Sequence, residues 1–286
     1  MLDFLTNRKQ YVRTELECSS TITINTGAPQ GCVLSAFLFI IYTNDLSRFS
    51  HNCRIIKYAD DTVVIGLIND NNEDDYKETI GYVTDWCSEN YLNLNVSKTK
   101  EMIIDMRRKT NVKEPINISN SPVDIVSSYK YLGVTIQDDL KWNKHVNIQT
   151  KKANKRMYYV RRLYKLKIDS KIICLFYNSV VSSVLTYAIS SWYNACDKNL
   201  KNSICKFYEK MCKMTNTSVH KSIEDPSDVY KNKCKSLIAK MVEDQDNVMN
   251  RYISVLPHGN LRSILCDTER FSRTFLPATI RLHNSK

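Results

Sequence analysis

The sequence has 286 residues, of which 43% are hydrophobic, and it contains only six glycines and six prolines. A chain of this length can bury a sizeable core in more than one domain, and its composition excludes collagen-like and low-complexity proteins. Its net charge of +11 favours a polyanionic partner, either nucleic acid or a membrane surface.

The ten cysteines show no Cys-x-x-Cys pair and no Cys/His cluster with the spacing of a zinc site. No secretory signal opens the sequence. We therefore expect a reduced intracellular protein with buried free thiols and no disulfide-linked partner, and the choice between nucleus and cytoplasm stays open. The longest apolar run is shorter than the ~20 residues of a membrane helix, so we expect no membrane partner.

The first 66 residues predict extended segments around a long apolar helix. Residues 21–25 are rich in β-branched side chains and predict a strand. Residues 26–31 contain two glycines and a proline and predict a turn, and the apolar run over 32–46 is long enough for a buried helix. Two β-rich runs within 54–66 then flank adjacent aspartates, which predicts a hairpin with acidic residues at its turn.

The segment before residue 141 continues this mixed pattern. Residues 76–90 carry apolar side chains at helical spacing and predict a helix. Residues 92–105 predict two strands around a turn at 97–99, and 128–136 is a further strand region.

After residue 141 the sequence becomes helical in character, and the tail, with Leu256-Pro-His-Gly259 and an end that contains Pro277, predicts loops and a short helix. The helical patterns cover residues 144–167, 171–193 and 199–214. The fold class is therefore α+β. The predicted domains are residues 1–140, 141–217 and 218–286.

Asp60 and Asp61 are the strongest chemical feature of the sequence. An isolated pair of aspartates is usually a polar turn exposed to water. Because side chains alternate along a strand, we expect that the two carboxylates do not both face the solvated side. The apolar runs on both sides make a buried carboxylate costly unless it is paired or binds a cation. A rigid hairpin that carries carboxylates is a suitable platform for Mg²⁺, which takes oxygen ligands.

Four short motifs occur in order between residues 26 and 136. They are Thr26-Gly-Ala-Pro-Gln-Gly-Cys-Val-Leu-Ser35, Tyr58-Ala-Asp-Asp61, Asn93-Leu-Asn-Val-Ser-Lys-Thr-Lys100 and Tyr131-Leu-Gly-Val-Thr-Ile136. In order and spacing they resemble the Gly/Pro-Gln-Gly box, the Tyr/Phe-x-Asp-Asp box, the motif after it and the primer-grip strand of reverse transcriptases. The resemblance is to the non-LTR (LINE-type) retrotransposon class, close to its Jockey/CR1-like branch, and to the C-terminal portion of such an enzyme.

This resemblance implies a fold and a reaction. The fold would be a partial right-hand polymerase palm over 1–140, with a small antiparallel sheet and helices. An α-helical, thumb-like or connection module would follow over 141–217, and 218–286 would be the C-terminal region of the open reading frame. The reaction would be two-metal nucleotidyl transfer by an RNA-directed DNA polymerase, using Mg²⁺ (or Mn²⁺), an RNA template, a DNA primer and dNTPs.

The resemblance also implies roles for individual residues. Asp60 and Asp61 would be catalytic metal ligands, and Lys98 would protonate the leaving pyrophosphate; a solvated turn lysine is the alternative. Tyr58 would pack beside the primer terminus, and its alternative is an ordinary strand aromatic. The nucleotide and template contacts would be Gly27, Pro29, Gln30 and Gly31, and the primer grip would be Leu132 and Gly133.

Two departures from the family pattern bear on activity. Ala36 stands where the family usually has proline, which would loosen the start of the following helix. The family's first palm box, which carries the partner aspartate, lies farther upstream of the residue-26 turn than the 25 residues present here. Because two-metal chemistry needs ligands from both strands, we expect that the isolated chain does not polymerise. Whether it is an enzyme stays open, and the alternative is a degenerate retroelement product that only binds nucleic acid.

Residues 141–217 carry the basic character of the sequence, with 16 lysines and arginines against three acidic residues. Cations recur among tyrosines at helical spacing, a pattern that suits the sugar-phosphate backbone of an RNA–DNA duplex. The alternative is a solvated basic face on a core helix. The candidate backbone contacts are Lys151, Lys152, Lys155, Arg156, Arg161 and Arg162.

Overall fold

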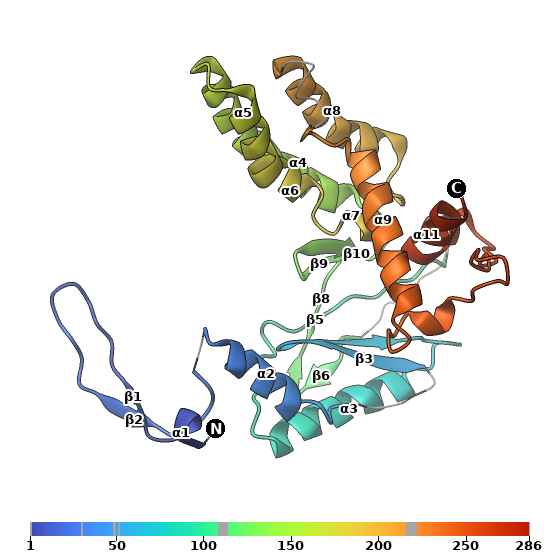
Figure 1. Ribbon diagram of the computed structural model, residues 1–286. Coiled ribbons are helices and arrows are strands. Elements are labelled where there is room, and N and C mark those ends of the chain that lie inside the picture. The colour runs from blue at the N-terminus through green and yellow to red at the C-terminus, as the bar shows by residue number, and fades with distance from the viewer. Residues whose placement is uncertain are drawn as a thin grey trace. The chain divides into compact units, whose positions relative to one another are not determined.

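The computed structural model describes residues 2–29, 31–47, 50, 52–107, 114–215 and 222–285 (Figure 1). Contacts between Cα atoms divide the chain into two compact units. The first unit is Met1–Glu101 with Lys113–Asp124, and the second is Met102–Val112 with Ile125–Lys286. The palm, thumb and C-terminal boundaries predicted from the sequence stay predictions, because this division concerns compactness alone.

The first unit pairs short antiparallel strands around two longer helices. Strands β1 and β2 pair antiparallel, as do β3 with β4 and β6 with β7. The elements of this unit are α1 (Leu2–Leu5), β1 (Arg8–Gln10), β2 (Ile22–Ile24), α2 (Val33–Tyr42), β3 (Cys53–Tyr58), β4 (Asp61–Gly66), α3 (Asp74–Glu89), β5 (Lys100–Glu101), β6 (Asn117–Ile118) and β7 (Ser121–Pro122). Strand β8 (Asp124–Ile125), which pairs with β5, begins where the unit ends.

The hairpin and the helix predicted over 54–90 are confirmed in outline. Strands β3 and β4 stay in register from Cys53 opposite Gly66 to Tyr58 opposite Asp61. Helix α3 buries Val83, Trp86 and Cys87, which the helical repeat places on one face. This face packs with Leu46 and with half-buried side chains of both strands. Each large apolar side chain buried there contributes about 1.5 to 3 kcal/mol, so α3 fixes the hairpin in the unit.

Two expectations for the first 105 residues are wrong. Within the described residues of 92–105, only the two residues of β5 are strand, because Asn95 turns the chain by accepting the backbone N–H groups of Lys98 and Thr99. Helix α2 forms as predicted but has no buried residue. Val33 is 89% exposed and Phe37 is 55% exposed, so the described part of the unit leaves one apolar face of α2 uncovered.

The second unit is a helical assembly on a short hairpin. Strands β9 and β10 pair antiparallel, with Tyr131 opposite Val134 at the turn. In chain order the elements are β9 (Ser128–Tyr131), β10 (Val134–Gln137), α4 (Asn143–Lys165), α5 (Ser170–Tyr177), the π-helix η1 (Asn178–Ser182), α6 (Ser183–Leu185), α7 (Ile189–Trp192), α8 (Lys198–Met214), α9 (Pro226–Glu243), the 3₁₀ helix η3 (Asn250–Tyr252), α10 (Glu269–Ser272) and α11 (Phe275–Asn284). The predicted helical patterns before residue 215 therefore fold as helices.

One face of α4 packs into the hydrophobic core of this unit. Its buried residues Ala153, Met157 and Val160 recur at helical spacing and pack with buried side chains of α5 to α8. Trp192 and Met211 are fully buried in the same cluster. The opposite face of α4 is left to solvent, and most of its cations lie there.

Helix α9 lies in a stretch for which the sequence analysis predicted no element. Its 18 residues begin at Pro226, and the carboxylate of Asp225 accepts the N–H of Ser227 as an N-cap. Tyr230, Cys234 and Ile238 are buried at intervals of four residues. The lysines between these positions make the apolar repeat hard to recognise in the sequence. The pair Asp225-Pro226, which is typical of a helix start, was the available signal. None of the helices in the described ranges is both long enough and apolar enough to cross a membrane.

Candidate active site

The β3–β4 turn presents the aspartate pair. Tyr58 and Asp61 close the ladder, so Ala59 and Asp60 form a two-residue loop. Ala59 has φ of 51°, a left-handed value that hairpin turns of this length usually give to glycine. Asp60 and Asp61 are both exposed. The expectation that they would not both face solvent is wrong, because Asp60 lies in the loop and not in the strand.

A cavity of about 260 Å³ lies beside Asp60. Helix α2 lines it with Phe39, the C-cap residue Thr43 lies beside it, and α3 lines it with Trp86 and Cys87. The chain after α3, over 92–94, completes the wall, so the motif that begins at Asn93 shares this cavity with the aspartate turn.

Lys57 is the cation of this cavity. Its Nζ donates to the carbonyl oxygen of Thr43. Burial lowers the pKa of Lys57, and the nearby charge of Asp45 opposes that shift. The cavity therefore holds one carboxylate, Asp60, and a lysine whose ammonium group is engaged by α2. Lys57 was not singled out from the sequence, although it directly precedes the Tyr58 motif.

The aspartate pair suits a divalent metal ion in chemistry. Carboxylate oxygens are the ligands that Mg²⁺ and Mn²⁺ prefer, and the side chains of Asp60 and Asp61 make no hydrogen bond or ion pair with another described residue. Among the described residues, however, no group of three His, Cys, Asp or Glu side chains is placed to hold a metal. The pair thus fits part of the donor set of a two-metal site.

The turn over 26–31 is held by a residue that the sequence analysis did not single out. Arg8 donates from Nη2 to the carbonyl oxygen of Gly27 at 2.8 Å and also to that of Thr26. Gly27 and Gly31 have φ of 67° and 79°, a conformation that glycine adopts without steric cost. The hydroxyl of Ser35 donates to the carbonyl oxygen of Pro29. Gln30 lies outside the described residues.

No hydrogen bond within the described part of the first unit joins this glycine turn to Asp60, and the described residues of the turn do not line the Asp60 cavity. The helix that follows the turn does reach the Asp60 cavity, through Phe39 and Thr43. Lys98 is exposed, and its backbone N–H donates to the side-chain and backbone oxygens of Asn95 at 3.1 Å. The turn therefore fixes the backbone of Lys98 and leaves its ammonium group in solvent.

The predicted primer-grip residues form the tight turn between β9 and β10. Leu132 and Gly133 both have positive φ, 44° and 84°, as a two-residue type I′ hairpin turn requires. The hydroxyl of Tyr187 donates to the carbonyl oxygen of Leu132 at 2.8 Å. A Cβ atom built on Gly133 would lie 2.9 Å from Cε1 of the same ring. Tyr187, which follows α6, was missed because only the fold brings it to a turn 55 residues earlier.

We expect that replacing Tyr187 with phenylalanine lowers the free energy of unfolding by about 1 kcal/mol. The change removes the hydrogen bond to Leu132 and leaves the ring against Gly133. Urea unfolding measures the loss, and Tyr159→Phe, at a tyrosine that is 57% exposed, is the control and is expected to change little. Equal stability of the two variants would show that the Leu132 contact contributes nothing.

Helix α4 carries the six predicted backbone contacts. Lys151, Lys155 and Arg162 share one face by their spacing of four and seven residues, and the guanidinium of Arg162 lies 5.9 Å from the ring centre of Tyr158. Arg156 differs from the others because it is half-buried and donates to the carbonyl oxygen of Val180 in η1 at 2.7 Å. The exposed members of the set are Lys151, Lys152, Lys155, Arg161 and Arg162.

The four motifs between residues 26 and 136 lie in a part of the chain that is similar to known proteins. The profile of the family described as "Reverse transcriptase (RNA-dependent DNA polymerase)" matches residues 2–136. The chain is 25% identical over 208 residues to the "Probable RNA-directed DNA polymerase from transposon X-element" of Drosophila melanogaster, a match that covers 69% of this chain and 22% of that protein. It is 26% identical over 207 residues to the "Probable RNA-directed DNA polymerase from transposon BS" of the same species, covering 68% and 23%.

A third relative is the "RNA-directed DNA polymerase from mobile element jockey" of Drosophila melanogaster, 24% identical over 210 residues, with 69% of this chain and 22% of the relative covered. The chain thus spans less than a quarter of the length of these relatives. No solved structure matches it significantly.

Proposed function

Because residues 2–136 belong to the reverse transcriptase family, in its LINE-type branch, we propose that the chain is the metal-binding and primer-holding segment of an RNA-directed DNA polymerase. The observation that carries the proposal is the pair Asp60 and Asp61, both exposed at a two-residue turn beside a cavity. A pair that only ended a hairpin would need no such cavity.

In this proposal Asp60 and Asp61 hold Mg²⁺ or Mn²⁺, with a further carboxylate supplied from outside the described residues. Ions held by these carboxylates would supply activation of the attacking primer oxygen and neutralisation of charge on the leaving pyrophosphate. Lys98, whose ammonium group is free in solvent, carries the proton that the pyrophosphate takes up. Tyr58, which is 63% exposed beside the pair, packs against the primer end.

The remaining assignments concern nucleic acid and nucleotide. The glycine turn contacts the template and the incoming dNTP, because glycine lets the backbone approach a substrate closely. Its proposed contacts are Gly27, Pro29, Gln30 and Gly31. Leu132 and Gly133 place the primer strand, held in position by Tyr187. The RNA template, DNA primer and dNTPs are thus proposed substrates.

Manganese binding tests the role of the carboxylates. We expect weak Mn²⁺ binding to the chain, monitored by electron paramagnetic resonance, that is lost when Asp60→Asn and Asp61→Asn are combined. The control combines Asp244→Asn with Asp246→Asn, an exposed acidic pair elsewhere, and retains the binding. Identical Mn²⁺ titrations of both double variants would refute the metal-binding role.

We further propose that the chain by itself binds a primed template without extending it, because two carboxylates are an incomplete donor set. The assay is primer extension on an RNA template with Mg²⁺ or Mn²⁺. Extension by the purified chain, abolished by Asp60→Ala, would overturn the proposed inactivity and support the role of the carboxylates at the same time.

The second candidate function is nucleic-acid binding without catalysis, and the exposed cations of α4 favour it. A protein that neutralises phosphates releases counterions, so its affinity falls with salt. We expect the triple variant Lys151→Ala, Lys155→Ala, Arg162→Ala to reduce the slope of log affinity against log salt by about 2 to 3, measured with an RNA–DNA duplex. The control removes the same charge from α9, with Lys233→Ala, Lys235→Ala and Lys240→Ala.

The two triple variants separate specific contacts from general charge. Equal slopes for both would mean that α4 has no particular role, and a flat salt response of the parent chain would remove nucleic-acid binding altogether. Binding without extension favours the second candidate for this chain, and extension favours the first.

A further inference from the structure

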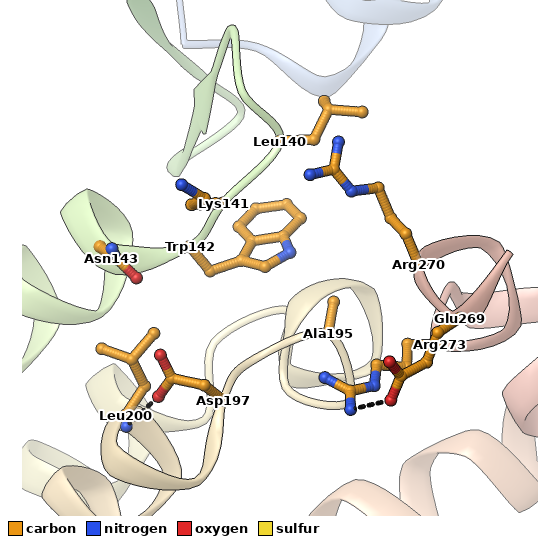
Figure 2. Close-up of a pocket in the computed structure, with 10 residues that line it drawn as sticks. All are labelled: Leu140, Lys141, Trp142, Asn143, Ala195, Asp197, Leu200, Glu269, Arg270 and Arg273. Carbon is orange, nitrogen blue, oxygen red and sulfur yellow. Dashed lines mark hydrogen bonds and ion pairs between the residues drawn. The ribbon is translucent and has the colours of Figure 1, made fainter. Parts of the chain in front are cut away.

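A second cavity, of about 430 Å³, lies within the second unit and apart from the residues assigned above. Three segments line it: the connection from β10 into α4, the start of α8 and the helix α10 (Figure 2). A volume of this order accommodates a group the size of one nucleotide.

The acidic side chains of this cavity are already engaged, so its cations are available to bind an anionic ligand. Asp197 is engaged as the N-cap of α8, where its Oδ1 accepts the N–H of Leu200 at 2.8 Å. Glu269 forms an ion pair with Arg273. Arg270 forms no ion pair with a described carboxylate, and the hydrogen bond that it donates goes to the weakly accepting sulfur of Met106.

Lys141 adds a second cation to the cavity. It pairs with Asp139 at 3.5 Å, but both side chains are largely exposed, so this pair contributes little and exchanges readily. An anionic group entering the cavity would therefore meet Arg270 and Lys141 without first breaking a buried ion pair.

Trp142 supplies the aromatic wall. Its indole lies between the side chains of Lys141 and Arg270 in Figure 2. One edge of the ring packs against His145, with 6.2 Å between ring centres, which holds the indole in place. Its N–H donates to no described residue. A fixed indole with a free N–H, flanked by a guanidinium and an ammonium group, matches a base joined to a phosphate.

We propose that this cavity binds one nucleotide of a single nucleic-acid strand, with the base against Trp142 and the phosphate on Arg270 and Lys141. A strand is favoured over a duplex because a base presents its face to a side chain only when it is unstacked. The first residue of α4, Asn143, lines the cavity, and Lys151 follows it by eight residues, about 12 Å along the helix axis. A strand that leaves the basic face of α4 could thus enter the cavity, and in this respect the inference rests on the proposed nucleic-acid function.

The test compares single strands with a duplex. Fluorescence anisotropy would follow labelled oligo(U), labelled oligo(dT) and a duplex of the same length, with uridine monophosphate as the free-nucleotide probe. We expect Arg270→Met and Trp142→Leu each to weaken single-strand binding about tenfold, and Trp142→Phe to stay within about threefold of the parent, because a phenyl ring still stacks. Duplex affinity is expected to stay unchanged.

The matched control is Arg262→Met, which removes the same charge from an exposed site outside the cavity. Circular dichroism establishes that each variant folds, and Arg270→Met decides the outcome if Trp142→Leu does not fold. Single-strand affinity equal in Arg270→Met and Arg262→Met would overturn the proposal. So would an equal loss for strand and duplex, or uridine monophosphate binding as tightly as the strand.

These results separate the two levels of inference. A parent chain that binds strands and duplexes with a steep salt response, but shows no effect of Arg270→Met, refutes the cavity assignment alone. A parent chain that binds neither probe refutes this assignment and the proposed nucleic-acid binding together.

Discussion

Replacing Gly133 with alanine is expected to lower the free energy of unfolding by about 2 to 5 kcal/mol, the largest effect of any single change predicted here. Gly133 has φ of 84°, which costs an L-residue about 1 to 2 kcal/mol. The new methyl group would also lie 2.9 Å from Cε1 of Tyr187, and forcing it in costs about 1 to 3 kcal/mol more. The ring cannot retreat freely, since its hydroxyl is bound to the carbonyl oxygen of Leu132.

Gly259 provides the matched control. Its φ of 81° is nearly the same, but a Cβ atom there would meet nothing within 4 Å. Gly259→Ala therefore measures the backbone cost alone, and the excess loss in Gly133→Ala measures the contact with Tyr187. Urea unfolding of both variants gives the comparison. If the two losses were equal, Tyr187 would not be packed on the turn as the structure shows.

Acidification from pH 7 to pH 5 is expected to remove about 1 to 2 kcal/mol of stability through His145 alone. Burial, together with the smaller effect of the charge of Lys152, lowers the pKa of this imidazole to about 4. The N–H of Thr135 donates to Nδ1 at 3.2 Å, so the neutral ring carries its proton on Nε2, which has no acceptor among the described residues. A second proton on Nδ1 would displace the Thr135 N–H.

The direction follows from the two pKa values. Below its ordinary pKa of 6.5, His145 takes up a proton in the unfolded chain but stays neutral in the folded one. Protonation thus favours unfolding, and stability falls as the pH drops from 6.5 toward 4. His145→Gln retains an acceptor and loses the titration, so its unfolding midpoint should depend less on pH than that of the parent. His258→Gln, at an exposed position, should keep the parent's slope; a slope like that of His145→Gln would contradict the assignment.

Local patterns predicted the elements that carry the aspartate pair. The two β-rich runs before and after the aspartates predicted the β3–β4 hairpin, and the helical repeat of Val83, Trp86 and Cys87 predicted α3. Both patterns involve only residues of one element or of two neighbouring elements, so the local sequence alone was sufficient to predict these elements. The exposure of Asp60 beside Asp61 was not predicted, because one residue decides whether a side chain lies in the turn or in the strand.

Contacts between distant residues were beyond the reach of periodicity. Nothing local marks Tyr187 as a neighbour of Leu132, or Arg8 as the donor to Gly27. The strand expected over 102–104 failed for the opposite reason, because its apolar residues look like a strand but find no partner strand within the described residues. A ladder needs a second strand, and composition cannot supply one.

The π-helix η1 sets the rotational phase of the chain that follows it. Each residue added to or removed from a helix turns everything beyond it by about 100°. Helices α5 and α6 run through η1 without a break, so deleting one residue from 178–182 would swing Tyr187 away from the Leu132 turn and carry the Val180 carbonyl away from Arg156. Deleting one residue within 178–182 should therefore destabilise the fold far more than deleting one residue from the loop over 245–247.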